Sequence, residues 1–167
     1  MKEVRTSIDI HASSASVWQA LTDFFSYREW LVDAPKITGK LEEGNSLEFS
    51  IGVTGAASRN CKLLLRKVDV ERELCWSLNT FAPKLFGSER RFVIKVSDAD
   101  KVEFIQSEVF WSLASALSAF VSYRSIRQAM EQMNRALKDR AEHLQKQLAV
   151  ETADTTVWPP PFRKGLT

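Results

Sequence analysis

The most specific polar signal in the sequence lies in residues 88–111, where two alternating stretches flank the turn residues 97–101. If Val96 faces Val102 across this turn, antiparallel pairing fixes the partner of every other residue in the two strands. The same register places Arg90 opposite Glu108. A guanidinium could polarise a carbonyl group while the carboxylate serves as acid or base, so these are the candidate catalytic residues if the protein is an enzyme.

The side chains that share this face indicate where the pair lies. They are apolar or amide residues: Phe92, Ile94, Val96, Val102, Phe104 and Gln106. Such a composition is typical of the concave face of a sheet, which would make Arg90 and Glu108 an ion pair beside or inside a cavity. The alternative is a pair at the solvated end of the hairpin, worth at most about 1 kcal/mol. The sequence leaves both positions open.

No other group of residues predicts a reaction. The sequence has no Ser, His and acid constellation with a suitable order in the fold, no Cys and His pair, no glycine-rich phosphate loop and no nicotinamide fingerprint. His11 and His143 form no metal-ligand spacing with Cys61 or Cys75, so we expect no metal and no cofactor. The two cysteines should lie roughly 20 Å apart on successive strands and stay free thiols.

The composition limits the classes of partner. With 23 Lys and Arg intermingled among 21 Asp and Glu, the net charge of +2 gives no electrostatic footprint for nucleic acid. The chain starts without an apolar signal region, and no run approaches the roughly 20 apolar residues of a membrane span. We therefore expect a cytoplasmic protein without a nucleic-acid partner and without stable membrane insertion.

A long amphipathic helix is predicted over residues 113–148, which contain no Pro or Gly. Its apolar stripe recurs every three or four residues: Leu113, Leu117, Phe120, Ile126, Met130, Met133, Leu137, Ala141, Leu144 and Leu148. The upstream sequence is typical of short strands, so a curved sheet is the natural partner of this stripe, and a ligand could lie between them.

Shorter elements are predicted before this helix. They are a strand over residues 4–10, a helix after the capping residues Ser13 and Ser14, a second helix opened by a capping box from Ser26 to Glu29 and ended before Pro35, and strands over residues 37–41, 47–53, 61–70 and 74–78. The inward face of residues 61–70 stays undecided because Leu63, Leu64 and Leu65 are consecutive.

A series of motifs occurs in a specific order along the chain. They are Val17, Trp18, Thr22, Asp23, Phe24, Tyr27 and Trp30 in the opening segment, then residues 39–49, 72–76, 87–92 and 106–110. In this order they resemble the START-like or SRPBCC superfamily, the helix-grip proteins that include the birch pollen allergen, over about residues 3–148. The superfamily includes a polyketide cyclase/dehydrase and lipid transport group.

The resemblance implies an α+β helix-grip fold. Such a fold has a curved antiparallel sheet of about seven strands, two short helices and one long C-terminal helix across the sheet. We expect a single domain over residues 1–149. Residues 150–167 contain three consecutive prolines and are expected to form a flexible extension.

The resemblance also implies a cavity between sheet and helix that binds an apolar or amphipathic small molecule. The ligand-binding residues expected there are Phe49, Trp76, Arg90, Phe92, Phe104, Gln106, Glu108, Phe110, Phe120 and Met130. Relatives often have His at the position of Arg90 and Gly near Ser112. This chain therefore carries a permanent positive charge where a titratable ring would lie.

Three functions remain open, because this fold hosts carriers, sensors, co-chaperones and cyclases. The favoured one is carriage or sensing of a hydrophobic small molecule. The second is a cyclase or dehydratase that acts on a polyketide-like substrate through Arg90 and Glu108. The third is a protein-interaction module that uses the long helix or the tail, where Trp158 and Phe162 flank the prolines.

Overall fold

The helices and strands follow one another in the predicted order. The computed structural model describes residues 2–32, 34–51, 59–79, 86–112 and 123–155. Its elements are β1 (Lys2–Ile10), α1 (Ser14–Thr22), α2 (Tyr27–Trp30), β2 (Lys36–Thr38), β3 (Ser46–Ile51), β4 (Arg59–Asp69), β5 (Glu73–Asn79), β6 (Phe86–Asp98), β7 (Lys101–Ser112) and α3 (Tyr123–Thr155). The start of the predicted long helix, with Phe120, and the tail residues Trp158 and Phe162 lie outside the described residues.

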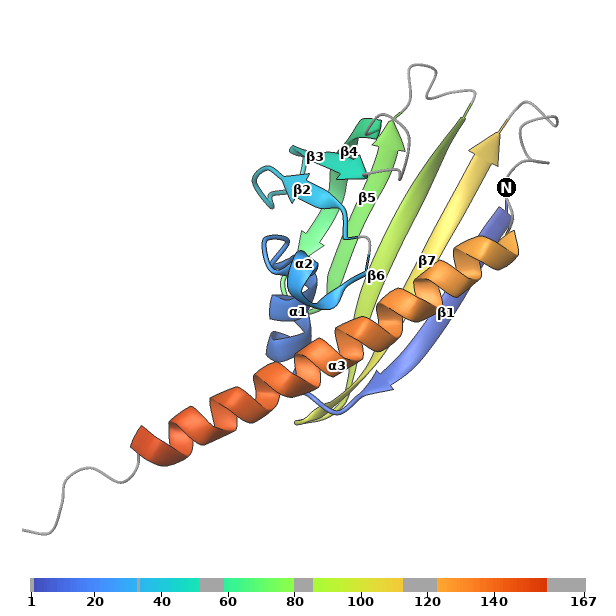
Figure 1. The fold of residues 1–167 in the computed structure, drawn as a ribbon. Helices are drawn as coiled ribbons and strands as arrows, with labels where there is room; N and C mark the ends of the chain where they lie inside the picture. The colour runs from blue at the N-terminus through green and yellow to red at the C-terminus, as the bar shows by residue number, and fades with distance from the viewer. Residues whose placement is uncertain (1, 33, 52–58, 80–85, 113–122, 156–167) are drawn as a thin grey trace, which may run out of the picture.

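All strands pair antiparallel in one seven-stranded sheet of order β1-β7-β6-β5-β4-β3-β2. The first strand therefore lies beside the last, while each other pair of neighbours is consecutive in the sequence. Figure 1 shows α3 crossing one face of the sheet, with α1 and α2 beside it. The predicted α+β helix-grip fold is confirmed.

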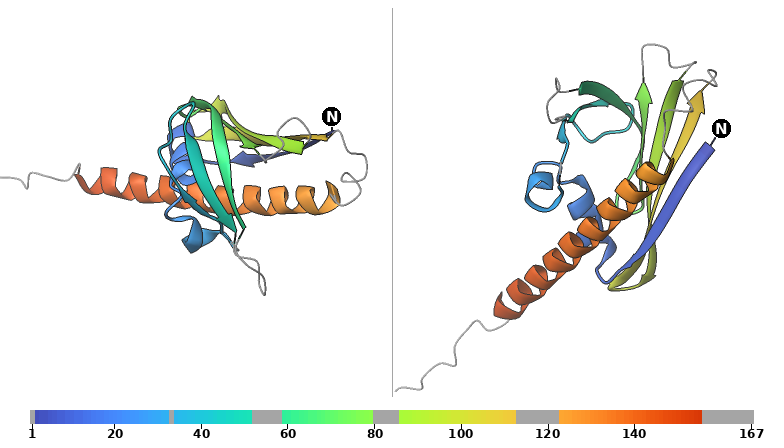
Figure 2. Two further views of the ribbon diagram at one scale, coloured as in Figure 1. Left: turned by 90° about the horizontal axis from the view of Figure 1, so that it is seen from above. Right: turned by 45° about the vertical axis from the view of Figure 1, so that its right-hand side comes forward.

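Helix α3 buries one stripe of its surface under the sheet. Met130, Asn134, Leu137 and Ala141 have at most 2% of their surface exposed, and their spacing of four, three and four residues is that of one helix face. Leu148 was predicted to belong to this stripe, but 48% of its surface is exposed. The reason is visible in Figure 2, where the C-terminal part of α3 projects beyond the strands and has no sheet to pack on. No helix among the described residues combines the length and apolar character needed to cross a bilayer.

The two short helices begin differently. Ser13 caps α1 as predicted, because its hydroxyl accepts from the Ser16 backbone N–H at 3.2 Å. The capping box predicted at Ser26 is wrong. Ser26 has helical backbone angles and makes no capping bond, and its hydroxyl instead donates to the carbonyl of Asp23 at 3.1 Å. The preceding turn thus competes successfully for the hydroxyl, and α2 ends after one turn at Trp30.

A bulge decides the inward face of β4. Leu63 and Leu65 are buried, with 5% and 1% of their surface exposed. The pairing with β5 then shifts between Leu65 and Lys67, and Val68 rather than Lys67 packs against the core. The extra residue changes the parity of the strand, so both of its halves present apolar residues inward while Lys67 stays in solvent.

Gln145 on α3 joins three parts of the fold at one point, which we call the Gln145 clamp. Its Oε1 lies 2.7 Å from Ser16 Oγ, 2.9 Å from Ser13 Oγ and 3.2 Å from the Ser13 backbone nitrogen. Its Nε2 donates to Asp100 Oδ1 at 3.0 Å, in the turn between β6 and β7. One side chain therefore holds the start of α1 and the β6–β7 turn against α3.

Charged residues of α3 extend the contacts near this clamp. Glu142 Oε1 accepts from the His11 backbone N–H at 2.9 Å, and Lys138 Nζ donates to the carbonyl of Asp9 at 2.7 Å. Burial acts to raise the pKa of Glu142, but the His11 N–H and the charge of Lys138 outweigh it, so the pKa lies below its ordinary value. Glu142 is therefore ionised at neutral pH and attracts Lys138.

We expect Gln145→Leu to lower the free energy of unfolding by about 1–3 kcal/mol, because Ser13 and Ser16 lose their acceptor and Asp100 loses a donor. The loss should appear as a lower Tm, by about 2–4 °C for each kcal/mol in a domain of this size. Gln147→Leu makes the same change at an exposed position of α3 and serves as the control. Equal melting temperatures for both variants would show that the clamp does not stabilise the fold.

Candidate functional site

The β6–β7 hairpin has the register that the sequence predicts. Val96 pairs with Val102, and the series continues with Ile94–Phe104, Phe92–Gln106 and Arg90–Glu108. Phe92, Phe104 and Gln106 have none of their surface exposed. The shared face is therefore the buried one, and the register prediction is confirmed.

Arg90 and Glu108 form an ion pair on this face. Arg90 Nε donates to Glu108 Oε2 at 2.9 Å, and Nη2 of the same guanidinium also contacts this oxygen. Only 10% of the Glu108 side chain is exposed, against 30% of the Arg90 side chain. The carboxylate is buried while the guanidinium reaches the surface, an arrangement between the two alternatives that the sequence left open.

The neighbours of the pair on the sheet explain why the carboxylate is dry. Glu108 pairs with Val4 on β1, and Arg90 pairs with Trp76 on β5. Val4 and Trp76 have 3% and 7% of their surface exposed. Apolar side chains thus flank the ion pair on both sides and exclude water, which strengthens the electrostatic interaction between the two charges.

An aromatic cluster lies next to the ion pair. The ring centroids of Trp76 and Phe92 are 4.9 Å apart at an interplanar angle of 66°, and those of Phe92 and Phe104 are 6.1 Å apart at 25°. All three rings belong to the hydrophobic core. The structure therefore brings three of the expected ligand-binding residues together with Arg90 and Glu108 on neighbouring strands.

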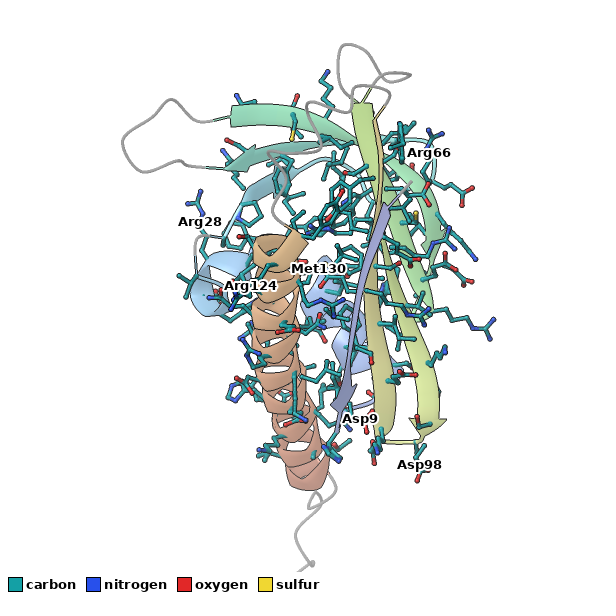
Figure 3. The ribbon with its side chains drawn as sticks, turned by 90° about the vertical axis from the view of Figure 1, so that its right-hand side faces the viewer. Asp9, Arg28, Arg66, Asp98, Arg124 and Met130 are labelled. Atoms are coloured by element: carbon teal, nitrogen blue, oxygen red, sulfur yellow. The ribbon has the colours of Figure 1, made fainter. Side chains whose placement is uncertain are left out.

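The remaining expected residues come from other elements. Met130 extends from α3 towards the strands and has 1% of its surface exposed (Figure 3). Phe49 on β3 is half-buried and packs against the core. Phe110, near the end of β7, makes an edge-to-face contact with Tyr123 at the start of α3, with ring centroids 6.2 Å apart. The expected set thus includes residues of both the sheet and the helix, and its last member, Phe120, is outside the described residues.

Asn134 is a buried polar residue that no sequence motif indicated. It has 2% of its surface exposed, and its Nδ2 donates to Thr6 Oγ1 on β1 at 3.0 Å. Thr6 pairs with Gln106, so a hydroxyl and two amides occupy neighbouring positions of β1, β7 and α3. The available signal was position, because Asn134 lies four residues after Met130 and three before Leu137 in the apolar stripe.

A groove of about 430 Å³ lies between β1 and the first turns of α3. It is lined by Glu3, Val4, Tyr123, Arg124 and Arg127. Arg124 marks the start of α3 in Figure 3. Because Val4 pairs with Glu108, the groove reaches the row of the ion pair from the edge of the sheet.

The cysteines do not add a nucleophile to the site. Both are free thiols, as predicted, and burial together with the nearby Glu89 raises the pKa of Cys75 to about 11. A thiol with this pKa is protonated at neutral pH and is a poor nucleophile. Burial also raises the pKa of Cys61. Within the described ranges, no three His, Cys, Asp or Glu side chains are grouped as metal ligands would be.

The family follows from comparison of the sequence with family models. Residues 1–148 match the family described as polyketide cyclase / dehydrase and lipid transport. The chain belongs to this family. The START-like resemblance noted in the sequence is thereby confirmed. A search of curated protein sequences found no significant match.

Solved structures with a similar fold include enzymes and a START protein. Norcoclaurine synthase from Thalictrum flavum, in complex with dopamine and hydroxybenzaldehyde, gives a TM-score of 0.60 at 14% identity, over 83% of this chain and 84% of that chain. Zhui aromatase/cyclase from Streptomyces sp. R1128 gives a TM-score of 0.61 at 15% identity, over 84% of this chain and 93% of that chain. A START superfamily protein from Mycobacterium smegmatis gives a TM-score of 0.56 at 17% identity, over 87% of this chain and 98% of that chain. At these identities the likeness shows the fold alone.

Family membership leaves binding and catalysis both open, because the family description covers cyclases, dehydrases and lipid transport. The choice between them depends on the residues of this chain.

We expect Glu108→Gln to lower the free energy of unfolding by about 1–3 kcal/mol, because a neutral amide replaces the carboxylate and the ion pair on the dry face is lost. The partly exposed guanidinium of Arg90 can turn to solvent, which keeps the loss below the roughly 3–5 kcal/mol of a fully buried pair. Urea denaturation measures the change.

The control for this variant is Glu89→Gln, at an exposed ion pair with Arg91 on the other face of the sheet, where we expect a loss under about 1 kcal/mol. Equal losses for the two variants would mean that the carboxylate of Glu108 is as solvated as that of Glu89.

Proposed function

We propose that the protein binds a hydrophobic or amphipathic small molecule between the inner face of the sheet and α3, with Arg90 and Glu108 holding the polar part of the ligand. The single observation that supports this function is a charged pair on a face that is otherwise uncharged and largely buried. The family, which includes lipid transport, supports the same class of ligand.

Stability alone gives a weak reason for this pair. Removing two charges from water costs free energy that their attraction often fails to recover, and apolar residues in their place commonly stabilise a fold equally well. A ligand that needs a fixed charge supplies a stronger reason. Arg90 can hold a carboxylate or a carbonyl oxygen, and its 30% exposed side chain can reorient to do so.

The carboxylate offers a second polar contact. Both hydrogen bonds from Arg90 end on Oε2 of Glu108, and no bond to Oε1 is found among the described residues. This oxygen can accept a hydrogen bond from a ligand hydroxyl without breaking the ion pair. The pair can therefore bind both an acceptor and a donor of a polar head group.

The test is a titration with cis-parinaric acid, a fluorescent fatty acid, on the wild type and on Arg90→Gln. The wild type should bind it saturably, and the variant should bind at least about fivefold more weakly, because a charge-assisted bond to the carboxylate is lost. Arg91→Gln changes the adjacent residue, which lies on the other face of the sheet, and should retain the wild-type affinity. Circular dichroism establishes that both variants are folded.

Two results would contradict the proposal. One is a wild type that shows no saturable binding of cis-parinaric acid and also carries no co-purified small molecule in a native mass spectrum. The other is an equal loss of affinity in both arginine variants, which would place the head group elsewhere.

A second candidate function is cyclisation and dehydration of a polyketide-like substrate, favoured by the same adjacent guanidinium and carboxylate. In an intramolecular aldol condensation, Glu108 would take a proton from carbon, Arg90 would stabilise the carbonyl oxygen that accepts the electrons, and one water would leave after the new carbon–carbon bond forms. The atoms balance without an oxidant or cofactor.

Enzymatic activity would appear as a product one water lighter than a linear poly-β-ketone thioester incubated with the protein. Arg90→Ala should abolish this product in a folded protein, whereas Arg91→Ala should not. Saturable binding of the thioester with no conversion would leave the protein as a carrier or sensor.

A further inference from the structure

Two amide side chains are buried at neighbouring positions between the sheet and α3. Gln106 on β7 has none of its surface exposed, and Asn134 on α3 has 2% exposed. Each carries a carbonyl oxygen that is buried and has no hydrogen-bond partner among the described residues: Gln106 Oε1 and Asn134 Oδ1. A buried acceptor without a donor is unfavourable, so a pair of them in one place calls for an explanation.

The two amides lie at the same level of the fold. Thr6 on β1 is the strand partner of Gln106, and its hydroxyl accepts from Asn134 Nδ2 at 3.0 Å. Gln106 Nε2 lies 3.7 Å from the sulfur of Met133, the neighbour of Asn134 on α3. Gln106 is two residues before Glu108 on β7, so it occupies the next inward-facing position of this strand. Asn134 lies opposite this position on α3, beside Thr6.

The contact with Met133 fixes which end of the Gln106 amide is unsatisfied. A thioether sulfur can accept a hydrogen bond but cannot donate one, so the NH2 group belongs on the side of Met133. Oε1 must then point away from the sulfur. The missing partner of Gln106 is therefore a hydrogen-bond donor.

We propose that Gln106 and Asn134 form an acceptor subsite for a hydroxyl group on the ligand. This inference rests on the proposed binding function and narrows its ligand class to molecules that carry a donor on an apolar frame. Arg90 at the outer level selects an acceptor, and the amides at the inner level select a donor. The preferred ligand thus has an oxygen acceptor at one end and a hydroxyl further along an apolar or aromatic skeleton.

Isothermal titration calorimetry with 2-naphthol and 2-methoxynaphthalene at neutral pH tests the subsite. The probes share the apolar frame, but only the first has a hydroxyl donor. The wild type should bind 2-naphthol about tenfold more tightly, a difference of about 1.4 kcal/mol. Gln106→Met and Asn134→Leu should each reduce this preference to under about threefold and leave the affinity for 2-methoxynaphthalene nearly unchanged.

The matched control is Gln132→Met, which removes an amide from the exposed side of α3 and should retain the tenfold preference. Two separate substitutions keep the test valid if one of them fails to fold. Thermal melting of each variant without probe detects this.

The outcomes separate the subsite from the binding function. If cis-parinaric acid binds but the wild type shows no preference for 2-naphthol, the subsite is wrong and the binding function stands. The subsite is also wrong if both amide variants keep the tenfold preference. If the wild type shows no preference for 2-naphthol and both amide variants melt at a lower temperature than the wild type, the partners of the two oxygens are buried water molecules instead. If neither naphthalene nor cis-parinaric acid binds, the binding function fails and the subsite fails with it.

Discussion

The pairing of β6 with β7 is the constraint on which the candidate site depends. Side chains alternate between the two faces of a strand, so a shift of one residue in this pairing would exchange the buried and exposed sets. The turn from Asp98 to Lys101 and the irregularity between Val96 and Asp98 set the register. With that register fixed, Arg90, Phe92, Phe104 and Glu108 face α3, and β1 and β5 add Val4 and Trp76 to the same row.

The register could be predicted because the turn and the alternating strands are all local in the sequence. The pairing of β1 with β7 joins distant parts of the sequence, and no local pattern predicted it. The inward face of β4 could not be predicted, since three consecutive leucines fit either parity and a bulge between Leu65 and Lys67 changes the parity within the strand. A bulge is a property of two paired strands, and the sequence of one strand does not reveal it.

The charged pair of the candidate site could be predicted from the sequence, but the buried amide of Asn134 could not. Arg90 and Glu108 stand out because charges on an apolar face are rare, whereas Asn134 on a helix rich in Arg, Gln and Glu does not stand out by type. Only its place in the apolar stripe distinguishes it. The prediction at Ser26 was wrong for the opposite reason. The sequence pattern suited a helix cap, but the Ser26 hydroxyl donates to the carbonyl of Asp23 in the preceding turn.

The Gln145 clamp has a mechanical consequence for α3. The helix is 33 residues long, and Gln145 makes the hydrogen bonds that join it to the start of α1 and to the β6–β7 turn. From Gln145 to Tyr123 the helix axis extends about 33 Å, so a tilt of the helix about Gln145 would move its first turn the most. A tilt of about 5° would displace Tyr123 by about 3 Å but Leu137 by only about 1 Å. A rotation of α3 about Gln145 would therefore change the groove between Val4 and Tyr123 most and the packing around Leu137 least.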